Sequence, residues 1–250
     1  MDCLSAALLG GLVAAVLTSL GSLAALPLHG LTKRLDRLMD VGLAFSAGVM
    51  LVASFTSLLL PAVEEWGLPL PLTGFLAGAA VMALVHYTVP HEHIVRGVYD
   101  GPAWGRRLRA ALLVAAAILI HNLPEGMAIG AASLYEPERG MLLGTAIGLQ
   151  DLPEGFAVTL PLIPVTGGRL KALAVGVLSG FSELLAAVLT ALLGQASSLP
   201  FLMGFGAGAM IFVVVREAIP EAFRGGYEDA ATLGFFAGFI LMLVLDTISA

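Results

Sequence analysis

The sequence predicts an all-α, polytopic membrane protein with eight transmembrane helices and an internal inverted repeat. Of its 250 residues, 58% are apolar and 12% are charged, which is about half the charged fraction of an average soluble domain. The apolar residues form long runs rich in Ala, Leu, Val and Gly, unlike the alternating ten-residue segments of an outer-membrane barrel. Two related polar hexapeptides interrupt neighbouring runs. Lipid cannot form hydrogen bonds with backbone N–H and C=O groups. These runs are therefore expected to be helices, which satisfy their own backbone groups.

Eight apolar runs are long enough to cross ~30 Å of hydrocarbon, which takes about 20 residues. They are expected to form a single transmembrane domain over residues 1–250. The first run has full span length and no basic segment before it, which favours a span over a cleaved signal peptide. We place the spans at residues 4–28, 40–63, 72–90, 108–134, 141–164, 170–195, 199–221 and 229–249.

This composition excludes an ordinary soluble enzyme, a disordered chain and a disulfide-stapled secreted domain. The single cysteine, Cys3, cannot pair within the chain. Prolines lie near the ends of four runs, where a helix tolerates them: Pro61, Pro90, Pro164 and Pro220. Pro124 and Pro153 instead lie in the middle of the fourth and fifth runs.

Small residues four positions apart predict close helix packing. Gly204 with Gly208 in the seventh run, and Gly42 with Ser46 in the second, have this spacing. In the second run, Ser46 also begins a row that follows helical spacing and could line one wall of a site: Ser46, Met50, Ala53 and Ser57.

Basic residues indicate the orientation of the spans. Of the twelve Lys and Arg residues, eleven lie in odd-numbered connections and only Arg139 lies in an even-numbered one. The first connection alone holds Lys33, Arg34 and Arg37. Connections rich in Lys and Arg stay in the cytoplasm. We therefore expect the odd connections, including loop 91–107, to be cytoplasmic and both termini to lie outside.

The two polar hexapeptides are HNLPEG at residues 121–126 and QDLPEG at residues 150–155. They match position by position on neighbouring antiparallel helices, as expected of an inverted repeat whose site lies between the repeats. His121 and Glu125 share a helix face, and so do Gln150 and Glu154. Each motif proline donates no backbone hydrogen bond, so a kink and a wet cavity are expected beside each motif.

Four acidic residues are predicted to lie near the middle of the membrane: Glu125, Asp151, Glu154 and, in the sixth run, Glu183. An ionised group there costs about 2.5–3.5 kcal/mol, and no Lys or Arg lies centrally in any run. Two divalent cations would neutralise the set. An imidazole, carboxylates and amide oxygens suit Zn²⁺ or a harder divalent ion, and the lack of a thiolate disfavours copper(I).

These residues resemble the ZIP (Zrt/Irt-like) family of divalent-metal transporters. The resemblance rests on the paired HNLPEG and QDLPEG motifs in membrane spans, on Glu183 in the next span, and on the AGVM string that ends at Met50. It covers most of the chain, and the span count and outward termini are similar too. Many family members carry a second His-Asn pair where this sequence has Gln150 and Asp151, and Gln at this position is similar to a bacterial branch.

The resemblance implies two adjacent ion sites. The first would be formed by both motifs and the second span: His121, Glu125, Gln150, Glu154 and Met50. The second would share the two glutamates and add three further residues: Asn122, Asp151 and Glu183.

The resemblance also implies the function. The protein would be a transporter and not an enzyme, and would carry divalent metal ions into the cytoplasm by alternating access. Zn²⁺ is the expected substrate, with Cd²⁺, Fe²⁺ or Mn²⁺ as further ones. A homodimer in the cell (inner) membrane is implied, as is an elevator-like movement of spans one, four, five and six against the others. The expected partners are metal ions and the lipid bilayer, with no nucleic acid.

Three alternative functions are compatible with a polytopic membrane protein. A metal-selective channel could use the same ligands, although multidentate sites hold ions too tightly for fast conduction. An intramembrane metalloprotease would need an HExxH string, which the sequence lacks. A receptor or sensor is a weaker alternative.

Polar residues outside the motifs admit two interpretations each. His91 and His93 in the third connection would bind metal on the cytoplasmic side, or belong to an ordinary loop. Glu217 and Glu221 would form an exit station for the ion, or pair with the neighbouring arginines.

Overall fold

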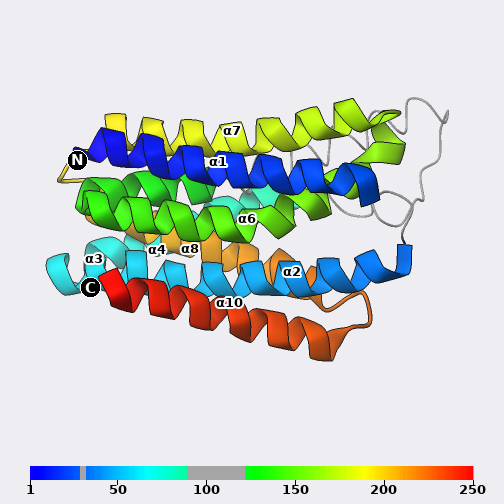
Figure 1. Cartoon of the computed structure of the whole chain (residues 1–250). Helices are drawn as coiled ribbons and strands as arrows, with labels where there is room; N and C mark the ends of the chain where they lie inside the picture. Colours follow the sequence, from blue (N-terminus) through cyan, green and yellow to red (C-terminus); the bar gives the residue numbers. More distant parts are fainter. Residues whose placement is uncertain (29–31, 89–121, 250) are drawn as a thin grey trace.

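The computed structural model describes residues 1–28, 32–88 and 122–249, and all regular structure within these ranges is helical. The helices lie side by side, with both termini at the same end (Figure 1). In chain order they are α1 (Cys3–Leu28), α2 (Thr32–Ala53), η1 (Ser54–Leu59), α3 (Leu60–Trp66), α4 (Pro69–Thr88), α6 (Pro137–Thr166), α7 (Arg169–Leu193), α8 (Leu199–Val213), η2 (Val214–Ala218), α9 (Ile219–Ala222) and α10 (Glu228–Ser249). Residues 122–135 form a further helix before α6.

The all-helical architecture agrees with the prediction. α1, α4, α6, α7 and α10 begin and end within a few residues of the expected runs. α2, η1 and α3 follow one another without a break, and so do α8, η2 and α9. The run expected at 108–134 is described only from residue 122, and loop 91–107 lies outside the described residues.

The start of α2 differs from the expectation. The helix begins at Thr32, well before residue 40, so Arg37 belongs to a helix and not to a connection. Lys, Arg, Leu and Met are good helix formers. A helix can therefore continue past the hydrocarbon, where water solvates charged groups.

Six helices in the described part of the chain are long and apolar enough to cross a membrane: Cys3–Pro27, Arg37–Trp66, Pro69–Thr88, Arg169–Leu193, Leu199–Ala222 and Glu228–Ile248. Their outward faces are apolar. On α1, exposed aliphatic side chains form a stripe at helical spacing: Leu4, Leu8, Leu12, Val16, Leu20 and Leu23. Lipid suits such a surface and water does not, so the chain is a multi-pass membrane protein.

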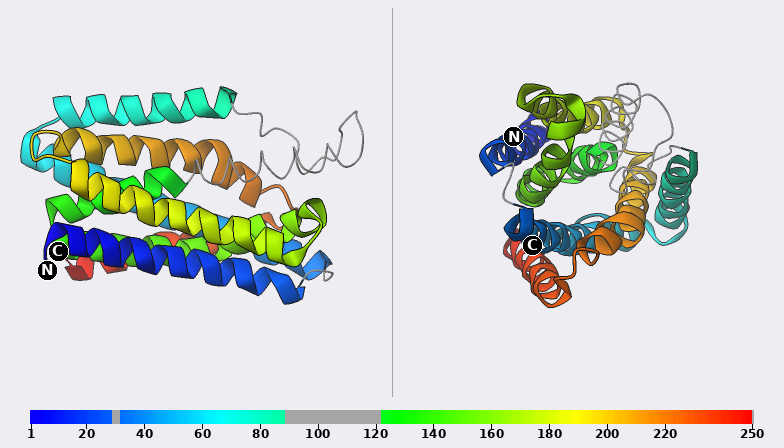
Figure 2. Two further views of the ribbon diagram at one scale, coloured as in Figure 1. Left: turned by 90° about the horizontal axis from the view of Figure 1, so that it is seen from above. Right: turned by 90° about the vertical axis from the view of Figure 1, so that its right-hand side faces the viewer.

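The helices form two bundles that lie side by side (Figure 2). The first bundle consists of α1, α6, α7 and helix 122–135, and the second consists of α2, α4, α8 and α10. Within the bundles, α1 packs on α6 and α7, α4 packs on α8, and α2 packs on α10. The bundles meet where α2 packs on α6.

Glycines at helix crossings let backbones touch, as α4 and α8 illustrate. A Cβ atom at Gly78 would lie 2.1 Å from the carbonyl oxygen of Phe205, and one at Gly208 would lie 2.0 Å from that of Phe75. Any side chain at these positions would push the two helices apart. The row that contains Gly204 and Gly208 is therefore a packing surface, as predicted.

Two π-helical segments occur in the second bundle, each shortly before a proline. η1 precedes Pro61, and η2 precedes Pro220. Proline lacks an N–H group, and its ring crowds the carbonyl four residues earlier. An extra residue in the turn moves that carbonyl away from the ring. Both prolines lie near helix ends as expected, but the π-helical segments were not predicted.

We expect Gly208→Val to weaken the packing of α4 on α8. The added side chain must displace the Phe75 carbonyl, and overpacking of this kind typically costs about 1–3 kcal/mol. The melting temperature of the purified protein in detergent should therefore fall. Gly168→Ala is the control, because a Cβ at Gly168 meets nothing within 4 Å. Equal melting temperatures for the two variants would contradict this account of the helix crossing.

Candidate metal centre

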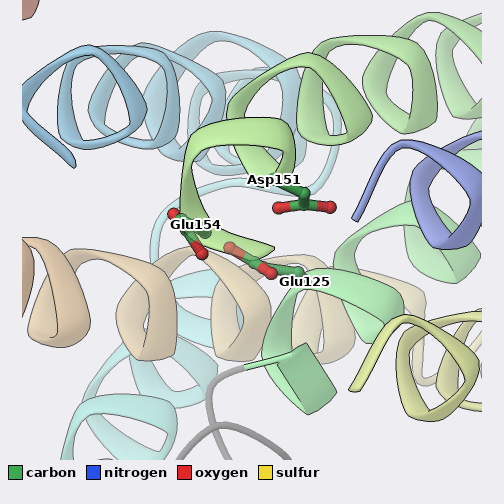
Figure 3. Close-up of side chains that lie close together, drawn as sticks. All are labelled: Glu125, Asp151 and Glu154. Carbon is green, nitrogen blue, oxygen red and sulfur yellow. The ribbon is translucent and has the colours of Figure 1, made fainter. Parts of the chain in front are cut away.

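Three carboxylates from helices of the first bundle meet (Figure 3). One oxygen each of Glu125, Asp151 and Glu154 lies within 4.8 Å of the other two. Glu125 comes from helix 122–135, while Asp151 and Glu154 come from α6. Within the described residues, this is the one group of three or more acidic, His or Cys side chains so closely spaced. Such clustered carboxylate oxygens are the ligands that hard and borderline divalent cations use.

Gln150 orients one of these carboxylates. Its Nε2 donates a hydrogen bond of 2.7 Å to Oε1 of Glu125, and both side chains are buried. Oε2 of Glu125 and Oε1 of Gln150 are buried without a hydrogen-bond partner among the described residues. Buried polar atoms normally have a partner, so these two oxygens are free to face a cation or a water molecule.

Glu183 of α7 adds a fourth carboxyl group beside Asp151. Glu183 is fully buried, and neither of its carboxyl oxygens has a hydrogen-bond partner among the described residues. It lies close enough to Asp151 that the two carboxyl groups would repel each other if both were ionised. A cation between them would turn this repulsion into attraction.

Thr18 of α1 also contacts Asp151. Its Oγ1 lies 3.3 Å from Oδ2 of Asp151 and 2.9 Å from the carbonyl oxygen of Ala14. The single hydroxyl hydrogen donates to one of these oxygens at a time. Oδ1 of Asp151 remains without a partner among the described residues.

A cavity of about 40 Å³ lies beside the carboxylates. Residues from α1, helix 122–135, α6 and α7 line it: Thr18, Asn122, Asp151, Glu154, Gly155, Val158 and Ser179. This volume is large enough for a water molecule. Asn122 is held there by a hydrogen bond of 3.4 Å from its Nδ2 to the carbonyl oxygen of Ser179.

The glycine that ends each hexapeptide brings the helices together at this centre. A Cβ atom at Gly126 would lie 2.2 Å from the carbonyl oxygen of Glu183, and one at Gly155 would lie 2.2 Å from that of Thr18. Helix 122–135 can therefore approach α7, and α6 can approach α1. Each glycine directly follows a glutamate of its hexapeptide. The close helix approach therefore brings Glu125 near α7 and Glu154 near α1. α6 continues as a helix through Pro153.

The α2 helix reaches the centre from the second bundle. Oγ of Ser46 donates a hydrogen bond to Oε1 of Glu154, so the first residue of the predicted row faces the centre. The last residue, Ser57, instead donates to Oδ1 of Asp246 on α10. Met50 follows Ser46 one turn later and is buried in the apolar core. Among the described contacts, none joins its sulfur to the carboxylates.

Most residues singled out from the sequence lie around this centre: Asn122, Glu125, Gln150, Asp151, Glu154 and Glu183. His121, His91 and His93 lie outside the described residues.

Thr18 and Ser179 were not predicted. Thr18 and Ser22 are polar and four residues apart in an otherwise apolar run, which is the pattern that could have identified Thr18. The backbone carbonyl of Ser179 accepts a hydrogen bond from Asn122. A pattern of side chains in the sequence cannot predict the role of a backbone group.

Glu217 and Glu221 have separate partners. Oε1 of Glu217 lies 2.9 Å from Nδ1 of His86 at the end of α4. Arg224 donates from Nη1 to Oε2 of Glu221 over 3.0 Å. The arginine pairing is therefore confirmed for Glu221, whereas Glu217 contacts a histidine.

We expect Glu183→Gln to raise the melting temperature of the metal-free protein. A buried polar group without a hydrogen-bond partner costs about 1–3 kcal/mol. The amide carries no charge and can donate a hydrogen bond toward Asp151. Thermal unfolding in the presence of a chelator checks this, with Glu64→Gln at an exposed position as the control. A melting temperature below that of the wild type would show that the Glu183 carboxylate is already stabilised.

Known proteins are similar in sequence to this chain over most of its length. The family model described as ZIP Zinc transporter matches residues 88–246. The zinc transporter ZIPB of Bordetella bronchiseptica is 43% identical over 253 residues, covering 96% of this chain and 80% of that protein. The zinc transporter GufA of Myxococcus xanthus is 35% identical, covering 97% of this chain and 98% of its own. The zinc transporter ZupT of Corynebacterium efficiens is 40% identical, covering 84% and 85%.

All three relatives are named as transporters, and the family is one of transporters and not of enzymes, as expected. With a family model that matches well over half of its residues and relatives that align along nearly its whole length, this chain belongs to the ZIP zinc transporter family.

Proposed function

We propose that this protein carries divalent metal ions, chiefly Zn²⁺, across the membrane into the cytoplasm. The observation that carries the proposal is the carboxylate cluster of Glu125, Asp151 and Glu154 inside a lipid-facing bundle. Such groups are costly in a membrane and typically mark an ion pathway. The relatives named as zinc transporters support Zn²⁺ as the substrate. Cd²⁺, Fe²⁺ and Mn²⁺ are further substrates for the same mixed oxygen and nitrogen ligands.

In this proposal the centre holds two ions. His121, Glu125, Gln150 and Glu154, with Met50, bind the first. Asn122, Asp151 and Glu183 bind the second and share the two glutamates. Two considerations support this division: the four carboxylates together need two divalent cations, and no Lys or Arg pairs with Glu125, Asp151 or Glu183 among the described residues.

The proposed topology has eight spans in one domain, with both termini outside the cytoplasm and the protein in the inner membrane. The shared location of the termini supports an even number of crossings (Figure 1). The connections from α6 to α7 and from α9 to α10 lie at the opposite end (Figure 1), and they carry or border Arg169, Lys171 and Arg224. This distribution of basic residues supports a cytoplasmic location for that end.

Alternating access would arise from movement of the first bundle against the second. The carboxylates come from helices of the first bundle, which contains the helices expected from spans one, four, five and six. The bundle can therefore move with its ligands as a unit. We further propose that the protein functions as a homodimer. A channel with the same ligands is the alternative, and it predicts ion currents far above carrier rates.

Uptake of Zn²⁺ into proteoliposomes tests the proposal. Glu125→Ala or Glu154→Ala should abolish saturable uptake, because each removes a ligand that both ions share. Glu64→Ala, at an exposed position outside the bundle core, is the control and should transport normally. Wild-type uptake in either glutamate variant would sink the two-ion scheme, and single-channel currents would favour the channel.

The second ion can be examined separately. Asp151→Asn and Glu183→Gln remove charge only from the ligands of the second site, so uptake should decrease yet remain measurable. Initial rates at several Zn²⁺ concentrations check this expectation. Complete loss of uptake would mean that transport requires both ions.

A further inference from the structure

A serine of the second bundle reaches the carboxylates of the first. Ser46 on α2 is fully buried, and its hydroxyl donates to Oε1 of Glu154 on α6. Among the described residues, the polar contacts of the other two carboxylates come from within the first bundle, since Gln150 donates to Glu125 and Thr18 lies beside Asp151. Ser46 thus brings the second bundle into direct contact with the candidate ion site.

The contact depends on the close approach of α2 to α6. One turn before Ser46, a Cβ atom at Gly42 would lie 2.6 Å from Cβ of Pro153. Gly42 and Ser46 are four residues apart, so they share the face of α2 that meets α6. Because Gly42 has no side chain, the short side chain of Ser46 can reach Glu154.

Hydrogen bonds of this kind influence metal binding. A carboxylate that binds a metal is normally held by a hydrogen bond from a neighbouring group, and loss of that group typically costs about 10–100-fold in metal affinity or activity. A carboxylate oxygen has two lone pairs. Glu154 can therefore accept the hydrogen bond from Ser46 and still bind an ion.

We propose that Ser46 is a positioning residue for Glu154 and makes the ion affinity of the site depend on how the two bundles pack. The proposal rests on the proposed function. The hydrogen bond exists only while α2 lies against α6. When the bundles shift, Glu154 loses this partner and the site holds its ion less tightly. This difference matters because an ion bound equally well in both arrangements cannot shift the equilibrium between them.

Zn²⁺ binding to the purified full-length protein, measured by equilibrium dialysis in detergent, tests the role of Ser46. Ser46→Ala should raise the dissociation constant at least about tenfold. Ser46→Thr keeps the hydroxyl and should restore most of the affinity. Ser54→Ala is the matched control, because Ser54 is buried on the same continuous helix and, among the described residues, bonds only to the carbonyl of Met50. Unchanged affinity in Ser46→Ala overturns the proposal, and a lowered melting temperature with unchanged affinity would mean a purely structural role.

A double-mutant cycle tests the dependence on bundle packing. Gly42→Ala adds a methyl group that must push α2 away from Pro153, so it should lower Zn²⁺ affinity when Ser46 is present. In the Ser46→Ala background the same change should have little further effect, because the hydrogen bond is already absent. Additive losses of affinity would overturn the link between the packing and the hydrogen bond.

Glu154→Ala separates this proposal from the proposed function. If Glu154→Ala binds Zn²⁺ as tightly as the wild type, the metal centre itself is wrong. If Glu154→Ala loses affinity while Ser46→Ala does not, the metal centre stands and only the role of Ser46 fails.

Discussion

The rest of the structure depends on one constraint, which is that carboxyl groups lie buried inside a bundle that faces lipid. Glu125, Asp151 and Glu183 are almost fully buried, and no Lys or Arg pairs with them among the described residues. A glutamine amide contacts Glu125, and a threonine hydroxyl and a small cavity lie beside Asp151. Such an arrangement is unfavourable without a cation. The chain belongs to a family described as zinc transporters, and a zinc ion would neutralise these groups.

Backbone contacts decide where these groups lie. Gly126 and Gly155 allow helix 122–135 and α6 to touch the backbones of α7 and α1. Each glycine directly follows a glutamate, so the residue that permits a close helix crossing is adjacent in sequence to an acidic residue. The same kind of contact joins α4 to α8 in the second bundle, where no acidic cluster results. Close helix packing at glycines thus occurs in both bundles, and the hexapeptides combine it with acidic side chains.

The division into two bundles gives the site an asymmetric environment. α1, α6, α7 and helix 122–135 supply the carboxylates and line the cavity. The second bundle contributes the Ser46 hydroxyl through the α2–α6 contact. A site built mainly by one body and completed by another can sense their relative position, whereas a site enclosed in one rigid body cannot. This is the physical reason that the function we propose is a carrier and not a static filter.

The sequence by itself determined the membrane-embedded helical fold, the approximate helix limits and most of the acidic centre. The length of an apolar run predicts a membrane-spanning helix. The four-residue spacing of Gln150 and Glu154 predicts that they share one face of α6. The sequence did not determine which residues of α1 and α2 contact the acidic centre. Periodicity describes a single helix, while the contacts of Thr18 with Asp151 and Ser46 with Glu154 each join residues more than one hundred positions apart. Only the tertiary structure decided these pairs, because they depend on where glycines let the backbones meet.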